Sequence, residues 1–478
     1  MLYDRQPALT EVDLNRIHQA SMEILGRGGL VFHHDGALNL FKKHGFSVSG
    51  QKVFITEKDV AKALETAPER FLAESRNSEK SRWIGRDDYV LVPTYGPPFV
   101  VDADGRQRLG TLADYEMAVK LNQTSSAADV TGFKYVAPSD IPAVTAYLDM
   151  LKMSLTLTDK PILGSTDDEK AAQDTMDIMA LLAGGKDRLR EKHWAIGLIN
   201  PLSPLAYAAD MAGAIMTYAA NRQPLIILNM ILAGSSGPIQ LPGMLALMNA
   251  ELLGGLVLAQ LAGPGTPVIY GTTSCPIYMK TGAAVVGNPE TLQISAATMQ
   301  LARFYKLPCR TGGSLTDSLM PDGQAMAEGA LGAMNALRGG VNLVLHALGM
   351  IGGYIGLSFE KWIMDEELWQ YAKVAAGAMA VTEETLNVEA VIKVGSGGSY
   401  LTRPETMKLC RKAFLGPTVF NKYDEAAWRK SGGQDLVAKC RVELSARCES
   451  YQKPDIDPAL EKDLNVLIDS LKASRGLK

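Results

Sequence analysis

Between residues 88 and 350, short apolar runs alternate with segments whose apolar residues have helical spacing. Stretches such as DEKAAQDTMDIMALLAGG and NPETLQISAATMQLARFYK separate the runs and favour amphipathic helices. The runs are YVLVPTY (89–95), DVTGFKYV (129–136), KPILGST (160–166), HWAIGLIN (193–200), QPLIILNM (223–230), TPVIYGT (266–272), LPCRTGG (307–313) and NLVLHAL (342–348). Strands that are apolar throughout and separated by helices predict a parallel sheet covered by helices on its outside.

Eight strand and helix units over roughly 260 residues match the size of a (β/α)8 barrel, which is also roughly 250 residues. An open, doubly wound sheet is the alternative, but no GxGxxG follows the first run. We therefore predict an α/β chain with a TIM barrel over residues 86–380. A helical N-terminal extension is expected over 1–85, where Thr10 has the position of a helix N-cap, and a helical C-terminal extension over 381–478.

Composition excludes several classes of protein. The formal net charge is -4, so no sequence-wide basic field would attract nucleic acid. The opening MLYDRQPALTEVD is polar and acidic where a signal peptide needs basic and then apolar residues, and stretches such as ELLGGLVLAQLAG fall short of the ~20 residues of a membrane span. The five Cys are scattered and form no CxxC pair, which argues against disulfide frameworks and structural zinc. We expect a cytoplasmic protein without membrane contact.

In a barrel, the active site lies at the carboxyl ends of the strands. Those ends carry Tyr95, Phe133 with Tyr135, Ser165 with Thr166, Asn200, Asn229, Thr272 with Thr273, Gly312, Gly313, Ser314 and His346. This set contains no carboxylate pair for glycosidic chemistry, no Lys for a Schiff base and no HxH or HExxH for a catalytic metal. We predict no metal site, although Cys275 and Cys309 also lie near strand ends and could approach His346.

The predicted lining is neutral, aromatic and rich in hydroxyl and amide groups. Aromatic faces attract a quaternary ammonium, which donates no hydrogen bonds. The rings that could form such a cage are Tyr95, Phe133, Tyr135, Tyr354, Phe359 and Trp362. For each ring, packing in the core is the alternative. His346 could likewise be a core histidine, but it ends the eighth run and precedes a glycine-rich loop that leaves room for a ligand.

Three segments together carry a family resemblance: IHQASMEILGRGGLVF, GGSLTDSLMPDGQAMAEG, and GSGGSYLTRPETMK with the following YDEAAW. They resemble the trimethylamine methyltransferase superfamily over nearly the whole chain. The resemblance implies a barrel enzyme that transfers a methyl group to Co(I) of a corrinoid held by a separate protein. It also implies that Tyr95 and His346 are the catalytic site residues.

Members of the superfamily that use methylamines carry pyrrolysine, whereas this chain contains standard amino acids only. The resemblance therefore implies the branch that uses quaternary amines, with glycine betaine expected first and proline betaine or carnitine as alternatives. The expected partners for the betaine carboxylate are Arg310, Gly312, Gly313, Ser314, Asn200 and Asn229.

Two other functions remain compatible with the sequence: a barrel lyase or aldolase, and a non-catalytic barrel that binds betaine for a corrinoid protein. Helical extensions on a barrel also make a homo-oligomer possible.

Overall fold

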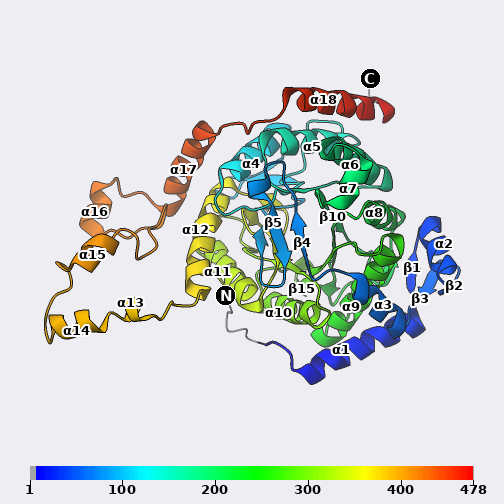
Figure 1. Ribbon diagram of the computed structural model, residues 1–478, viewed down its shortest axis with the longest axis horizontal. Coiled ribbons are helices and arrows are strands. Elements are labelled where there is room, and N and C mark those ends of the chain that lie inside the picture. The colour runs from blue at the N-terminus through cyan, green and yellow to red at the C-terminus, as the bar shows by residue number, and fades with distance from the viewer. Residues whose placement is uncertain (1–6, 477–478) are drawn as a thin grey trace.

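A computed structural model describes residues 7–476 of the chain (Figure 1). The first six residues, part of the opening segment from which we expect no signal peptide, lie outside this range. A ring of strands stands at the centre, and helices surround it (Figure 1).

The central sheet has seven parallel strands in the order β6-β18-β17-β14-β12-β10-β9. They are β6 (Val90–Leu91), β9 (Ile162–Leu163), β10 (Ala195–Ile199), β12 (Leu225–Asn229), β14 (Val268–Thr272), β17 (Cys309–Gly312) and β18 (Leu343–Leu345). All but Gly312 are buried, as expected for strands covered on both faces. The predicted barrel is confirmed.

The second predicted strand, 129–136, closes the ring without forming a regular strand. The Asp129 N–H donates to the Leu91 carbonyl at 2.9 Å, and Thr131 bridges in parallel to Ile162. Beyond this point the segment turns across the end of the first strand. The Tyr135 carbonyl accepts a hydrogen bond from the Thr94 hydroxyl at 2.7 Å. These contacts with a loop replace a strand ladder, so the predicted strand is shorter than its apolar pattern suggests.

The outer layer is formed by helices that follow the strands. They are α4 (Leu112–Thr124), α5 (Ala146–Leu157), α6 (Glu169–Ala183), α7 (Lys186–Glu191), α8 (Ala209–Ala220), α9 (Leu241–Ala262), α10 (Pro289–Phe304), α11 (Gly323–Gly339) and α12 (Phe359–Ala376). By length and composition α9 could cross a membrane, but 94% of its most apolar window is buried inside the protein. It packs against α8 and the N-terminal helices, which explains its apolar sequence.

Small sheets cover the carboxyl end of the barrel. One combines the loops after β6 and β18, in the order β19-β20-β7-β8, and another the loops after β12 and β14, in the order β13-β15-β16. Their strands are β7 (Phe99–Val101), β8 (Gln107–Leu109), β13 (Leu232–Ala233), β15 (Cys275–Tyr278), β16 (Ala283–Ala284), β19 (Met350–Ile351) and β20 (Gly356–Leu357). These pairings fix the loops that surround the barrel mouth.

The N-terminal part contains strands as well as helices. Its elements are α1 (Glu11–Glu23), β1 (Leu30–Phe32), α2 (Asp35–Lys43), β2 (Ser47–Ser49), β3 (Lys52–Phe54), α3 (Glu57–Thr66), β4 (Arg70–Ala73) and β5 (Arg82–Gly85). Thr10 caps α1 as its sequence predicts, since its side chain accepts from the Asp13 N–H. β1 pairs with β11 (Ala206–Tyr207), which ties this part to a barrel loop.

Up to residue 476, six helices follow α12. They are α13 (Glu383–Leu386), α14 (Val388–Val394), α15 (Pro404–Leu409), α16 (Glu425–Lys430), α17 (Leu436–Ser450) and α18 (Pro458–Ser474). In Figure 1, α13 to α16 stand away from the barrel, and α17 and α18 return along it. α17 packs against α12 and α4, and α18 against α5 and α6.

Candidate active site

A cavity of about 170 Å³ opens at the carboxyl ends of the barrel strands. It brings together five of the residues predicted from the sequence: Tyr95, Asn200, Arg310, His346 and Tyr354. Its remaining lining consists of Gly96, Leu198, Leu228, Met230, Thr273 and Leu345. The lining therefore comes from β10, β12, β17 and β18 and from the loops that follow β6, β10, β12, β14 and β18. This is the position at which barrel enzymes bind their substrates.

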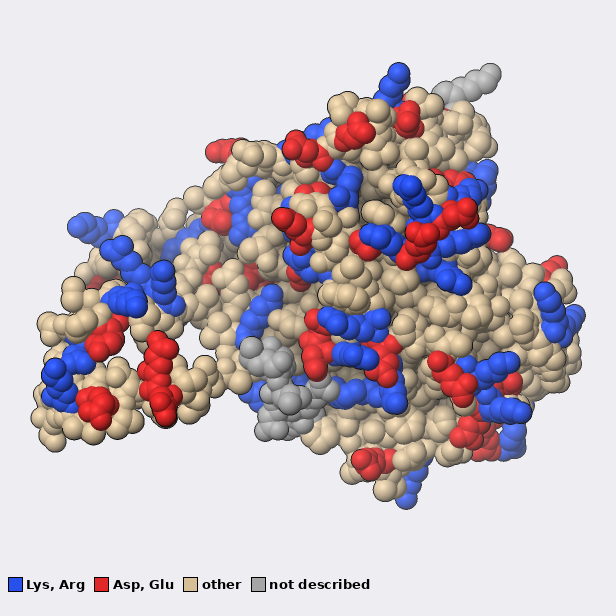
Figure 2. Space-filling view, viewed as in Figure 1, with Lys and Arg blue, Asp and Glu red and all other residues tan. Residues whose placement is uncertain are grey.

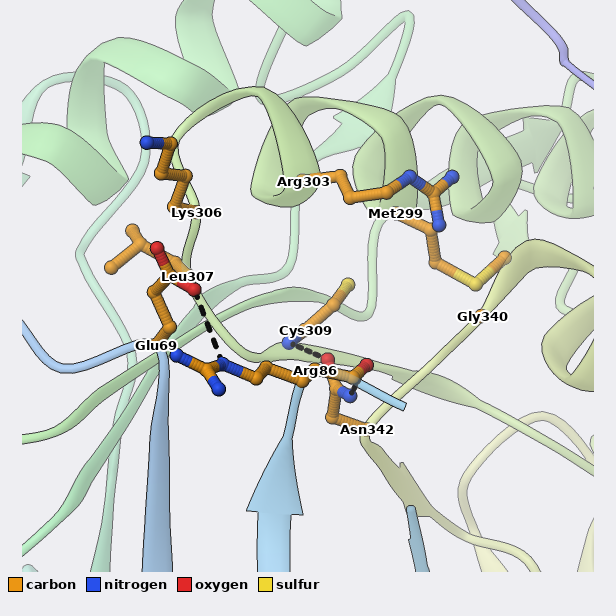
Figure 3. A pocket seen from close by; sticks show the side chains of 9 residues that line it. All are labelled: Glu69, Arg86, Met299, Arg303, Lys306, Leu307, Cys309, Gly340 and Asn342. Carbon is orange, nitrogen blue, oxygen red and sulfur yellow. Dashed lines mark hydrogen bonds and ion pairs between the residues drawn. The ribbon is translucent and has the colours of Figure 1, made fainter. Parts of the chain in front are cut away.

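A second cavity of the same volume lies at the opposite end of the barrel (Figure 3). Cys309 begins β17, and Asn342 directly precedes β18. The Asn342 amide donates to the carbonyl oxygens of Arg86 and Asp88, each at 2.9 Å, and accepts from the Cys309 N–H. These bonds join strand starts to a loop. Because side chains at the amino-terminal face of a barrel serve stability, we assign the site to the other cavity.

Arg310 is a fully buried side chain of the mouth cavity. Its Nη1 donates to the Thr272 carbonyl at 2.5 Å, while Nε and Nη2 have no hydrogen-bond partner among residues 7–476. Burial lowers the pKa of Arg310 to about 10, so the guanidinium remains charged at neutral pH. A buried charge with two free donors is costly unless an anion pairs with it. The fork of Nε and Nη2 fits a carboxylate.

His346 is a buried, neutral group beside Arg310. The Tyr95 N–H donates to its Nδ1 at 3.3 Å, which leaves the proton of the neutral ring on Nε2. Burial, together with the charge of Arg310, holds the pKa of His346 well below its usual value. The ring can therefore donate one hydrogen bond into the cavity without adding a second positive charge.

His346 and Tyr354 both adopt left-handed backbone conformations, with φ of 62° and 75°. Such conformations are uncommon for residues with bulky side chains and cluster at functional sites. The two rings lie 5.1 Å apart between centroids, and the Tyr354 hydroxyl donates to the Thr273 carbonyl at 3.4 Å. The strained backbone thus places two rings on the same wall of the cavity.

Four other predicted cage residues lie in the core and do not line this cavity: Phe133, Tyr135, Phe359 and Trp362. The Tyr135 hydroxyl accepts from the Asn122 amide at 2.7 Å, and the Trp362 indole donates to Glu366 at 2.9 Å. Their polar atoms are therefore used within the protein.

Four predicted carboxylate partners are likewise absent from the cavity lining. Gly312 and Gly313 line a separate narrow cavity, and Ser314 donates to Asp365 at 2.5 Å. The Asn229 amide donates to Glu251 at 2.9 Å.

The apolar lining, including Leu198 and Leu228, was missed by sequence reasoning. Both residues lie inside continuous apolar runs, which give no sign of which side chains point inward. Thr273 is one of the strand-end residues predicted from the sequence, whereas Met230 was missed although it directly follows β12. Within residues 7–476, no group of three or more His, Cys, Asp or Glu could hold a metal ion.

Comparisons with known proteins identify the family of the chain. The family model described as trimethylamine methyltransferase (MTTB) matches residues 4–476. The chain is 38% identical to a glycine betaine methyltransferase of Desulfitobacterium hafniense, covering 98% of this chain and 97% of that protein. It is 31% identical to a proline betaine:corrinoid methyltransferase of Eubacterium limosum, with 97% of each chain covered.

Its identity to the trimethylamine methyltransferase MttB of Methanosarcina barkeri is 30%, over 98% of this chain and 96% of that one. Among solved structures, the hydroxylamine complex of MtmB aligns with a TM-score of 0.50 at 12% identity. That alignment covers 91% of this chain and 94% of MtmB, and it supports the barrel fold.

Proposed function

Because the chain belongs to the trimethylamine methyltransferase (MTTB) family, we propose that this methyltransferase takes its methyl group from glycine betaine and passes it to a corrinoid held by a separate protein. The observation that carries the choice of substrate is Arg310, which lines the cavity at the barrel mouth and has two donors without a hydrogen-bond partner.

Arg310 favours a substrate that bears a carboxylate. A betaine carboxylate would accept from Nε and Nη2 and neutralise the buried charge. Trimethylamine has no anionic group, so it would leave the guanidinium unpaired. The 38% identity to a glycine betaine methyltransferase supports the same choice.

The lining also orients the cationic end of the betaine. Arg310 is fully buried, whereas Met230 is 42% exposed at the outer side of the cavity. A carboxylate held by Arg310 would direct the trimethylammonium group toward the open mouth, between the rings of Tyr95 and Tyr354. Aromatic faces attract such a cation, and the neutral His346 does not repel it. One methyl group would then face outward.

Exposed apolar side chains around the mouth of the barrel support contact with a corrinoid protein there. The loops after β10, β14 and β17 carry exposed apolar side chains at Leu202, Met279 and Leu319. A corrinoid supplies Co(I), a strong nucleophile toward carbon, when its own protein presents it. The apolar rim would exclude water from this contact.

This reaction requires little general acid–base catalysis from the chain itself. A quaternary nitrogen already bears the positive charge that makes the departing amine neutral, so no proton donor is required. The neutral state of His346 agrees with that chemistry. The residues bind, orient and desolvate the substrate, and the rate gain comes from placing the methyl carbon in line with its acceptor.

An anaerobic assay tests the proposal. Purified protein is mixed with glycine betaine and either reduced cobalamin or the cognate corrinoid protein, and Co(I) absorbance and dimethylglycine are followed together. We expect Co(I) to disappear in equal amount to the dimethylglycine formed. Protein without substrate is the control.

Turnover of proline betaine or carnitine but not glycine betaine would correct the substrate and keep the Arg310 argument. Turnover of trimethylamine alone would contradict that argument. Binding of betaine without any methyl transfer would contradict the proposed reaction.

A further inference from the structure

Residues 378–417, here called the arm, leave the barrel after α12 and hardly touch it. Ala390 is the only buried residue of the arm. The chain returns at Val419, whose N–H donates to Glu367 of α12 at 3.1 Å. Figure 1 shows α13, α14 and α15 standing clear of the barrel, and Figure 2 shows open space between this part of the chain and the main body.

The arm exposes large apolar side chains. Met379 is 91% exposed, Phe414 87% and Leu401 80%. Its helices α13, α14 and α15 contain four, seven and six residues. Isolated helices shorter than about 12 residues are marginal in water, so such helices need a surface to pack against. A segment with this many exposed large apolar side chains indicates a site of protein contact.

The arm begins at the end of the barrel opposite the active site. α12 starts at Phe359, after the mouth loops, and runs for 18 residues, about 27 Å. Near its last turn, the Lys373 ammonium lies 5.7 Å from the ring centroid of Tyr89, which directly precedes β6. A corrinoid protein must face the cavity at the other end, so it is a poor candidate for the occupant of the arm.

The charge of the arm is nearly balanced, with four acidic and five basic residues. Its attraction to a partner is therefore mainly apolar, which is typical of permanent contacts between identical chains. The exposed apolar side chains include Met379, Val381, Leu386, Val388, Val391, Ile392, Leu401, Met407, Leu409 and Phe414.

The area available on the arm suits a stable dimer. At roughly 60–120 Å² for each of those side chains, one arm offers roughly 600–1,200 Å² of apolar surface. Two arms and the equal area of partner surface that they would cover give a total buried area within the ~2,000–5,000 Å² range of obligate homodimers.

We propose that the arm packs against a second copy of this chain, with two arms exchanged about a two-fold axis. Each arm would bury the same apolar side chains on its partner, as a closed, isologous contact requires.

Light scattering after size-exclusion chromatography tests the proposal. We expect the wild-type chain to have twice its 51.5 kDa mass, or a higher even multiple. The double variant Leu401→Glu, Phe414→Glu should have the mass of one chain. Both positions are exposed in the single chain, so circular dichroism should be unchanged. Val466→Glu on α18, at a position 62% exposed, is the matched control and should keep the wild-type mass.

Labelling of Cys410, an exposed thiol on the arm, gives a second readout. Chains labelled separately with donor and acceptor dyes should show energy transfer after they are unfolded and refolded together, and the double variant should not. A wild-type chain with the mass of one chain at ~50 µM overturns the proposal. So does an arm variant that associates as wild type does, or a single chain that associates only when the corrinoid protein is added.

Discussion

At the scale of single residues, Arg310 separates substrate binding from stability. Arg310→Lys keeps a positive charge but loses the planar fork. Hydrogen bonds to charged groups contribute about 1.5–3 kcal/mol, so we expect KM for glycine betaine to rise at least about tenfold. Steady-state kinetics with saturating corrinoid protein measures this change.

Arg310→Met provides the complementary test. Removing an unpaired buried charge should leave the thermal midpoint of the substrate-free protein equal or higher, while betaine binding is lost. Differential scanning calorimetry with and without betaine measures both effects. A large drop in the midpoint would instead mean that Arg310 is a structural residue held by its bond to Thr272.

His346 predicts a dependence of stability on pH. Its pKa is held well below the ordinary value, whereas the unfolded chain takes up a proton below pH ~6.5. The free energy of unfolding therefore falls as the pH drops below about 6.5, and this contribution is fully present above that pH. In His346→Asn, the decline should be shallower by up to about 1.4 kcal/mol per pH unit. Urea unfolding between pH 5 and 7 measures it.

Asn is the suitable replacement because it tolerates a left-handed backbone, which His346 adopts at φ 62°. Parallel curves for wild type and variant would mean that His346 titrates normally in the folded protein.

Sequence reasoning at this scale found Tyr95 and His346 because each lies at or near the end of an apolar run, where a polar or aromatic residue stands out. It found Arg310, which lies inside the run 307–313, because a guanidinium can bind a carboxylate through two hydrogen bonds. It also selected Phe133 and Trp362, which the structure places in the core. Proximity to a strand end does not reveal where a ring points, so the aromatic residues could not be sorted from sequence alone.

At the scale of elements, α12 holds the loops that follow β17 and β18. Lys361 and Asp365 are fully buried one helical turn apart, with 2.8 Å between Nζ and Oδ1. Asp365 also accepts from the Ser314 hydroxyl at 2.5 Å and from the Gly349 N–H at 2.8 Å. One carboxylate thus joins two loops at the mouth to the helix.

Asp365→Asn should destabilise the protein by about 3–5 kcal/mol, because it leaves the Lys361 ammonium buried without a counter-charge. The double variant Lys361→Met, Asp365→Leu should recover part of that loss, since no buried charge remains. Urea denaturation at neutral pH compares the three proteins. Equal stabilities of wild type and Asp365→Asn would show that the pair contributes nothing.

Most barrel strands were predictable because a continuous apolar run between two helical patterns has few other structures available to it. The run 129–136 behaves differently, since Gly132 lies so close to the Thr94 carbonyl that a Cβ would be 2.6 Å from its oxygen, and Tyr135 bonds to the loop after β6. Such tertiary contacts leave no periodic mark in the sequence.

At the scale of the whole molecule, the arm is the segment most open to proteolysis. In the Leu401→Glu, Phe414→Glu variant, limited trypsin digestion should cut first within 378–417, at sites such as Arg411. The wild-type protein should be cut there more slowly, because the proposed partner covers the arm. Mass spectrometry of the first fragments identifies the sites.

The two pieces of the nicked variant should still elute together. α17 packs against α12 and α4, and Arg447 on α17 pairs with Glu366. Separation of the fragments without denaturant would show that the C-terminal helices are held only through the arm. Helical patterns in the sequence predict a helical C-terminal extension, but they do not show that the arm stands free, since exposure depends on the fold around it.

The unpaired guanidinium of Arg310 also links the lifetime of the enzyme in the cell to the concentration of its substrate. An empty molecule holds an uncompensated charge in its interior, and a molecule loaded with the proposed substrate would not, so bound betaine would stabilise the folded chain by mass action. Cellular proteases degrade the less stable form faster. When betaine is scarce, the enzyme would therefore be cleared sooner, and its abundance would follow the nutrient supply without any change in gene expression.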